Sequence, residues 1–189
     1  MGLFDKLGKR KEDNDLKQML ENAVKAAFET LLKEHDETYY YCSLITDEEG
    51  NCPFISAWSR EALQKILQEN DVTSEDEKLE YKWSYADSPY CAYGWEDYFT
   101  EINDMIEERK NIYEEDDRLD EWLELLLDYM EKVMKNLDKQ GVFGVGEKRN
   151  QIVINAEVMP PNYGNTLRAL RLNKKENLCE WLEEIAEEE

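Results

Sequence analysis

The chain has 189 residues, a formal net charge of −22 and 41% hydrophobic residues. This length suits one domain with a core of ordinary size, and the hydrophobic fraction excludes a disordered acidic tail. A surface this negative repels phosphate backbones, which argues against DNA or RNA binding and favours a basic protein partner, although the charge also serves solubility.

The beginning of the chain has the opposite charge. Residues 1–11 carry four cations and one acid, and they lack the apolar stretch of a secretory signal. No apolar run reaches the roughly 18 residues that span a bilayer. We therefore expect a cytoplasmic protein with a flexible basic leader over residues 1–14 and a single domain over 15–189. The leader also contains a few apolar residues, a composition compatible with weak contact with an anionic membrane.

Hydrophobic periodicity, β-propensity and turn residues predict alternating helices and strands. In chain order these are the helix Asp15–Glu34, the strands Thr38–Thr46 and Cys52–Ala57, a helix capped by Ser59 that ends at Glu69, the strand Leu79–Tyr85, the helix Glu96–Tyr113, the helix Arg118–Lys139, the strands Val142–Gly146 and Gln151–Met159, and a last helix that begins with Asn173 and Glu176. Thr166–Leu172 fits a strand and a helix equally well.

These elements predict an α+β fold. We expect a single domain with an antiparallel or mixed sheet of about five strands covered by about five helices.

Four cysteines are dispersed along the chain without the C-x-x-C spacing of a metal or redox site. If the turn Asp47–Gly50 places Thr46 opposite Asn51, Cys52 lies opposite Ile45 and points away from Cys42. That register disfavours a disulfide between the two cysteines, and we expect reduced thiols.

The catalytic options are few. His35 is the only histidine, and it falls where the first helix ends, a position at which its charge complements the helix dipole. The chain contains neither a Gly-rich phosphate loop nor a serine elbow. We therefore predict no catalytic residue, no cofactor and no metal.

The stretch Tyr81–Trp95 stands out because six of its fifteen residues are Tyr or Trp. The turn Asp87-Ser88-Pro89 divides it into a strand-like half and a polar-aromatic loop. Its aromatic side chains fit two roles, core packing and partner anchoring. Asp87 suits closure of the turn, and it is also the one acid inside the aromatic stretch. The candidate binding residues are Tyr85, Asp87, Tyr90, Tyr93 and Trp95.

Several segments resemble a bacterial family of unknown function, similar to DUF4303. They are Tyr39–Thr46 with the turn Asp47–Gly50 and Pro53, the stretch Tyr81–Tyr90 followed by Gly94, Tyr98-Phe99 and Asn103, and the later segments Val142–Gly144 and Ile152–Val158. The likeness covers roughly residues 15–185. It implies a shared fold and a context near toxin–immunity genes, and it transfers no catalytic residue.

The residues and the resemblance together favour a non-enzymatic module that binds a basic protein, for example an immunity-like protein that neutralises a basic toxin. An alternative is a small carboxylate-dependent hydrolase or transferase that uses Asp87 with a second acid. A third possibility is a structural or regulatory domain whose leader touches a membrane.

Overall fold

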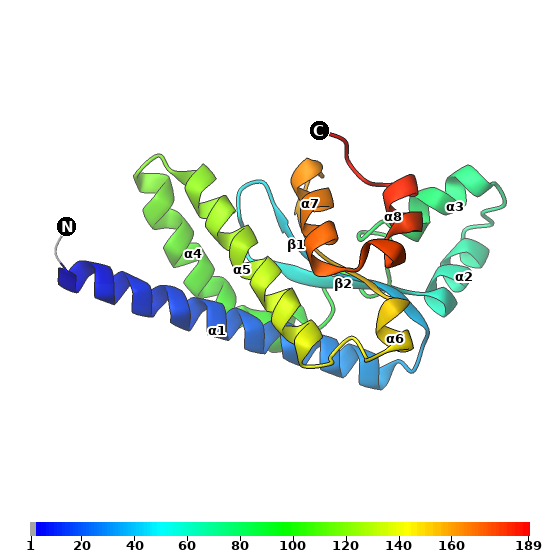
Figure 1. Ribbon diagram of the computed structural model, residues 1–189, viewed down its shortest axis with the longest axis horizontal. Coiled ribbons are helices and arrows are strands. Elements are labelled where there is room, and N and C mark those ends of the chain that lie inside the picture. Colours follow the sequence, from blue (N-terminus) through cyan, green and yellow to red (C-terminus); the bar gives the residue numbers. More distant parts are fainter. Residues whose placement is uncertain (1–2) are drawn as a thin grey trace.

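The computed structural model describes the backbone of residues 3–189 and the side chains of residues 13–189. Over this range the strands β1 (Tyr39–Asp47), β2 (Phe54–Ser59) and β3 (Val153–Met159) form one mixed sheet. The central strand β1 pairs antiparallel with β2 and parallel with β3. Helices surround the sheet (Figure 1), so the predicted α+β class is confirmed. The prediction of about five strands is wrong, because the described sheet has three.

The helices fall into a long pair and several shorter pieces. They are α1 (Leu3–Glu34), α2 (Arg60–Glu69), α3 (Glu75–Lys82), α4 (Thr100–Glu115), α5 (Leu119–Lys139), α6 (Glu147–Asn150), α7 (Tyr163–Leu172) and α8 (Cys179–Glu184), with a π-helical turn η1 (Trp95–Phe99) and a 3-10 turn η2 (Lys175–Asn177). Among the described residues, no helix combines the length and the apolar composition that crossing a membrane requires.

The two long helices, α1 and α5, contact each other and supply much of the core. Phe28 on α1 packs edge-to-face on Phe143, with ring centroids 5.1 Å apart, and α5 buries Trp122 and Leu126 completely. Helix α1 begins at Leu3, before the predicted start at Asp15. The predicted membrane contact of residues 1–11 depends on side chains that lie outside the described residues, and it stays a prediction.

The hairpin β1–β2 closes in a different register from the one expected. Phe54 pairs with Ile45, and Cys42 pairs with Ala57, so Cys52 lies in the connection before β2. All four cysteines are free, as predicted. Ser59 ends β2 and caps α2, since its hydroxyl accepts a hydrogen bond from the backbone N–H of Ala62 at 2.9 Å.

The predicted strand Leu79–Tyr85 is wrong, because α3 occupies most of it. Ser74 caps this helix by accepting from the N–H of Glu77 at 3.2 Å, and three acids in its first turn complement the helix dipole. The alternating pattern that resembled a strand is also compatible with a helix. Leu79 and Trp83 are four residues apart and therefore lie on one side of a helical turn.

The predicted strand Val142–Gly146 is also wrong. Gly144 and Gly146 have φ angles of +90° and +59°, which an extended strand does not contain. The segment instead turns from α5 into the short helix α6, and Phe143 is its fully buried side chain.

Helix α7, which resolves the ambiguity over Thr166–Leu172, covers the outer edge of β3. The amide of Asn165 bonds both the N–H and the C=O of Val158, at 2.9 and 3.0 Å. The amide of Asn173 does the same for Ile154, at 3.0 and 2.7 Å. Asn173 directly follows α7 and the last helix, α8, begins at Cys179, so the prediction that Asn173 begins the last helix is wrong. These side chains satisfy an edge that would otherwise be open to pairing with another strand.

Candidate functional site

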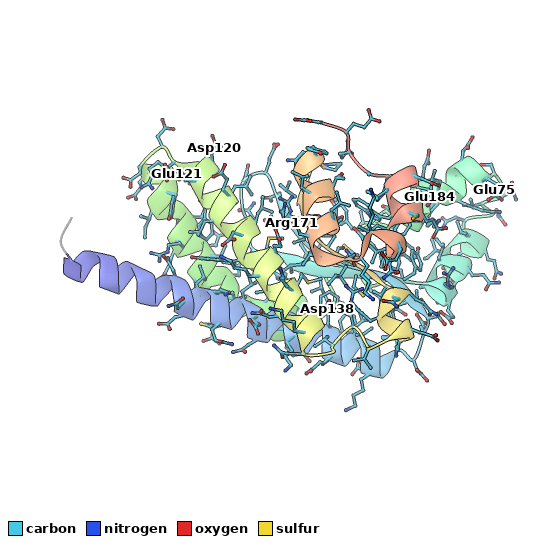
Figure 2. The ribbon with its side chains drawn as sticks, in the orientation of Figure 1. Glu75, Asp120, Glu121, Asp138, Arg171 and Glu184 are labelled. Atoms are coloured by element: carbon cyan, nitrogen blue, oxygen red, sulfur yellow. The ribbon has the colours of Figure 1, made fainter. Side chains whose placement is uncertain are left out.

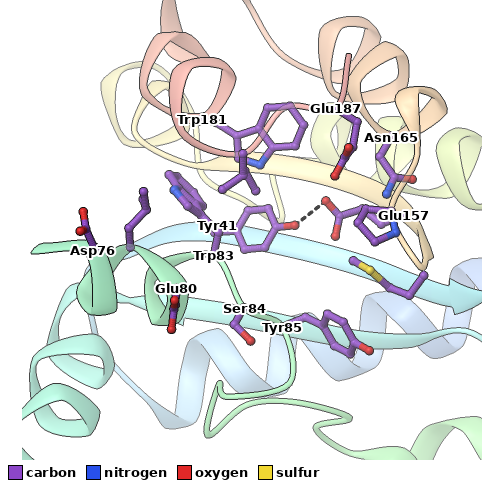
Figure 3. A pocket seen from close by; sticks show the side chains of 14 residues that line it. Tyr41, Asp76, Glu80, Trp83, Ser84, Tyr85, Glu157, Asn165, Trp181 and Glu187 are labelled. Atoms are coloured by element: carbon purple, nitrogen blue, oxygen red, sulfur yellow. Dashed lines mark hydrogen bonds between the residues drawn. The ribbon is translucent and has the colours of Figure 1, made fainter. Parts of the chain in front are cut away.

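A cavity of about 550 Å³ lies between the sheet and the helices α3 and α8, and we call it the α3–α8 pocket (Figure 3). It is lined by four aromatic residues, namely Tyr41, Trp83, Tyr85 and Trp181. It is also lined by four acids, namely Asp76, Glu80, Glu157 and Glu187. Its size and its apolar walls with a few polar groups are typical of a ligand site.

The carboxyl group of Glu157 is the pocket's most buried acid. The side chain is 3% exposed and extends from β3. Its Oε1 accepts hydrogen bonds from the hydroxyl of Tyr41 at 2.5 Å and from the amide of Asn155 at 2.9 Å. Burial raises the pKa of Glu157, and these two hydrogen bonds act in the opposite direction.

A buried arginine lies close to this acid without pairing with it. Arg168 donates to the carbonyl of Ala156 at 2.6 Å and to Oδ1 of Asn165 at 2.5 Å. Burial lowers the pKa of Arg168, and its charge in turn favours the ionised form of Glu157. Glu157 forms no ion pair with a described residue, so its charge is only partly compensated.

The wall formed by α3 is attached to α8 through polar contacts. Oε2 of Glu184 accepts from Nζ of Lys82 and from the indole N–H of Trp83, both at 2.6 Å, and Lys82 also pairs with Glu180 at 2.6 Å. Helix α3 itself contains no buried residue. This polar cluster therefore adds to the packing of Trp83 and Leu79 against the core in holding the wall in place.

The opposite wall holds Trp181, whose side chain is 2% exposed. Its indole N–H has no acceptor among the described residues. Buried polar groups in native proteins nearly always have a partner, so this one calls for an explanation. The edge of the ring that carries the nitrogen is turned towards Tyr41 in Figure 3.

The structure distributes the five predicted site residues over four places. Tyr85 lines the α3–α8 pocket and lies 6.0 Å from the ring of Phe54. Asp87 is exposed and accepts from the hydroxyl of Ser84 at 2.5 Å, as part of a local turn. Trp95 stacks on Phe99 with an interplanar angle of 5°.

Tyr90 and Tyr93 lie around His35 and line a second cavity of about 570 Å³. Their ring centroids are 4.8 and 6.0 Å from that of the histidine. Tyr90 donates to Glu37 at 2.8 Å, and Tyr93 donates to Glu34, which raises the pKa of Tyr93 to about 12. A binding role stays a prediction for each of these side chains, but the five residues do not form one site.

The sequence reasoning missed Glu157, Trp181 and Tyr41. A signal was present in β3, where Asn155 and Glu157 alternate with apolar residues in a strand that is otherwise entirely hydrophobic. A polar residue inside such a strand needs a specific partner. The described side chains contain no group of acids, histidines and cysteines that could hold a metal ion.

Comparison with known proteins adds a family. A family model described as a domain of unknown function (DUF4303) matches residues 20–174. Neither a curated protein nor a solved structure matches the chain. The matched residues make up well over half of the chain and include the strands β1, β2 and β3. The prediction made from the sequence is therefore confirmed, and the protein belongs to the DUF4303 family.

Proposed function

We propose that the protein is a non-enzymatic binding domain that recognises a basic partner protein, with a cationic group of the partner held in the α3–α8 pocket. The observation that carries this proposal is the composition of the pocket. Four acids and four aromatic residues line it, and none of the described lining residues is Lys, Arg or His.

Both kinds of lining residue attract cations. Carboxylates do so by charge, and the faces of aromatic rings do so through their quadrupole. One such contact lies beside the pocket, where Nζ of Lys82, which does not line it, is 5.1 Å from the ring centroid of the lining residue Trp83. Glu157 adds a buried acid that forms no ion pair with any described side chain, and a bound cation would compensate its charge.

The charge of the whole molecule supports the same partner. Among the acids labelled in Figure 2, Glu75 lies on α3, and Asp120 and Asp138 lie at opposite ends of α5, so negative charge is not confined to the pocket. The electrostatic field of such an acidic surface accelerates the encounter with a cationic protein, and salt weakens this acceleration. An immunity-like role against a basic toxin is one form of this proposal.

The test compares three blocked amino acids of similar size by calorimetry at low salt. Nα-acetyl-lysine methylamide and Nα-acetyl-arginine methylamide are cationic, and Nα-acetyl-norleucine methylamide is neutral. We expect at least one cation to bind about tenfold more tightly than the neutral compound, a gain typical of a desolvated cation–aromatic or charge contact. Equal affinities for all three compounds would contradict the proposal.

Glu157→Gln should remove most of this preference, because it deletes the buried charge and keeps the shape of the side chain. Glu124→Gln is the matched control, since Glu124 is exposed on α5 and does not line the pocket. A partner protein purified from the native host at low salt should then show the same dependence on Glu157.

One observation favours a second candidate, a carboxylate-dependent hydrolase or transferase. Glu157 combines burial in a cavity with a raised pKa, which are properties of general acids. Asp87 does not line the pocket, so Glu157 would replace it as the acid of such an enzyme. Turnover of ester, amide or phosphoester probes that Glu157→Gln abolishes would support this candidate.

A further inference from the structure

The α3–α8 pocket contains two hydrogen-bonding positions that the described residues leave open. One is the indole N–H of Trp181, which is buried and has no acceptor. The other is Oε2 of Glu157, because both hydrogen bonds to this carboxyl group go to Oε1. An occupant that satisfies both positions must present a donor to Glu157 and an acceptor to Trp181.

The geometry at Glu157 discriminates between the two basic side chains of proteins. The guanidinium group of arginine binds a carboxylate best through two parallel N–H···O bonds, one to each oxygen. Oε1 already accepts from Tyr41 at 2.5 Å and from Asn155 at 2.9 Å, so this paired arrangement is blocked. The ammonium group of lysine is a compact point charge and needs only the remaining oxygen.

The walls of the pocket suit the rest of a lysine side chain. Tyr41 and Trp83 meet edge-to-face, with centroids 5.5 Å apart, and Trp181 lines the pocket opposite α3. Lysine buries its four methylene groups along apolar surfaces of this kind while its charged end reaches a polar partner.

We propose that the α3–α8 pocket takes a lysine residue of the partner. Its ammonium group donates to Oε2 of Glu157, its methylene stem packs against the aromatic walls, and its backbone carbonyl accepts from the indole N–H of Trp181. This inference rests on the proposed function. It adds that the basic residue is lysine and that the backbone carbonyl of this lysine is recognised as well.

The test uses the full chain and four probes: Nα-acetyl-lysine methylamide, its arginine and norleucine counterparts, and butylamine, which carries the ammonium group without a carbonyl. We expect the lysine compound to bind about tenfold more tightly than the arginine compound, the scale of one charge-assisted hydrogen bond. In Trp181→Phe, the ratio of the affinities for the lysine compound and butylamine should fall about fivefold, because only the lysine compound offers an acceptor.

A measurement on the unsubstituted protein covers the case in which Trp181→Phe does not fold. The indole N–H groups of Trp58, Trp83 and Trp122 already have acceptors. In a ¹H–¹⁵N spectrum, the signal of Trp181 should therefore move downfield with the lysine compound and stay in place with butylamine.

The outcomes separate the two levels of the proposal. If the norleucine compound binds as tightly as both cations, the proposed function itself fails. If the cations bind preferentially but arginine equals or exceeds lysine, the assignment of lysine fails. If the affinity ratio and the Trp181 signal are unchanged, the indole N–H does not bind a carbonyl of the partner, and this part of the proposal fails.

Discussion

The hydroxyl of Tyr41 donates to Oε1 of Glu157 at 2.5 Å, across two parallel strands whose residues are 116 positions apart in the sequence. This bond lies at the floor of the α3–α8 pocket (Figure 3) and links the central strand to the edge strand. It stabilises the ionised form of Glu157, which burial disfavours. The charge of Glu157 therefore depends on the balance between its burial and the groups that favour its ionised form, namely Tyr41, Asn155 and Arg168.

The first prediction concerns the pH dependence of stability. Burial raises the pKa of Glu157 above the ordinary value of 4.5, so between these two values the native state holds a proton that the unfolded state has released. The free energy of unfolding contributed by this group therefore falls as the pH rises through that window. We expect Glu157→Gln, which cannot ionise, to gain stability relative to the unsubstituted protein over the same pH range.

Urea denaturation at a series of pH values measures this difference. Glu124→Gln is again the control, because the same loss of charge at an exposed position should give a difference that varies little with pH. A stability difference between Glu157→Gln and the unsubstituted protein that stays constant from pH 4 to pH 8 would count against a raised pKa.

The second prediction concerns Tyr41→Phe. This substitution removes the hydrogen bond that favours the ionised form, so the pKa of Glu157 should rise further. It should also cost about 1–3 kcal/mol of stability, the usual range when a charged group loses a hydrogen bond. The pKa can be followed through the ¹³C signal of the Glu157 carboxyl group. A lower pKa in the variant would mean that burial near Tyr41 matters more than its hydroxyl.

Local signals explain which elements could be predicted. Ser59 caps α2 as expected, and hydrophobic periodicity predicted the helix Arg118–Lys139, which the structure has as α5 (Leu119–Lys139). These features depend on neighbours within one or two turns. The segment Leu79–Tyr85 misled because its aromatic alternation fits a strand, while the cap at Ser74 lies outside the segment and decides for a helix.

The site could be predicted much less well than the fold. The α3–α8 pocket is assembled from Tyr41 in β1, Trp83 after α3, Glu157 in β3 and Trp181 in α8, and no local pattern connects them. The aromatic density of Tyr81–Trp95 directed attention to one stretch of chain. In the structure that stretch contributes Tyr85 and its neighbours to one wall, while its second half packs around His35 and on Phe99.

The third prediction concerns the edge of the sheet. Asn165→Ala removes two hydrogen bonds to the backbone of Val158 and leaves a buried N–H and C=O without partners. We expect a loss of about 3 kcal/mol in the free energy of unfolding, together with aggregation through the exposed edge. Denaturation and light scattering measure the two effects.

Asn150→Ala is the control for this loss, because Asn150 is an exposed asparagine in α6 whose change should cost about 0.5 kcal/mol or less. Equal losses for the two variants would show that the Asn165 amide does not protect the strand.

The fourth prediction concerns the wall of the pocket formed by α3. This helix has no buried residue, and Oε2 of Glu184 accepts from both Lys82 and Trp83. Glu184→Ala should therefore speed amide hydrogen exchange in α3 by about tenfold, while the free energy of unfolding changes by less than about 1 kcal/mol. Glu183→Ala is the matched control, because Glu183 directly precedes Glu184 and is exposed. Unchanged exchange in α3 would show that the contacts of Glu184 do not hold the helix in place.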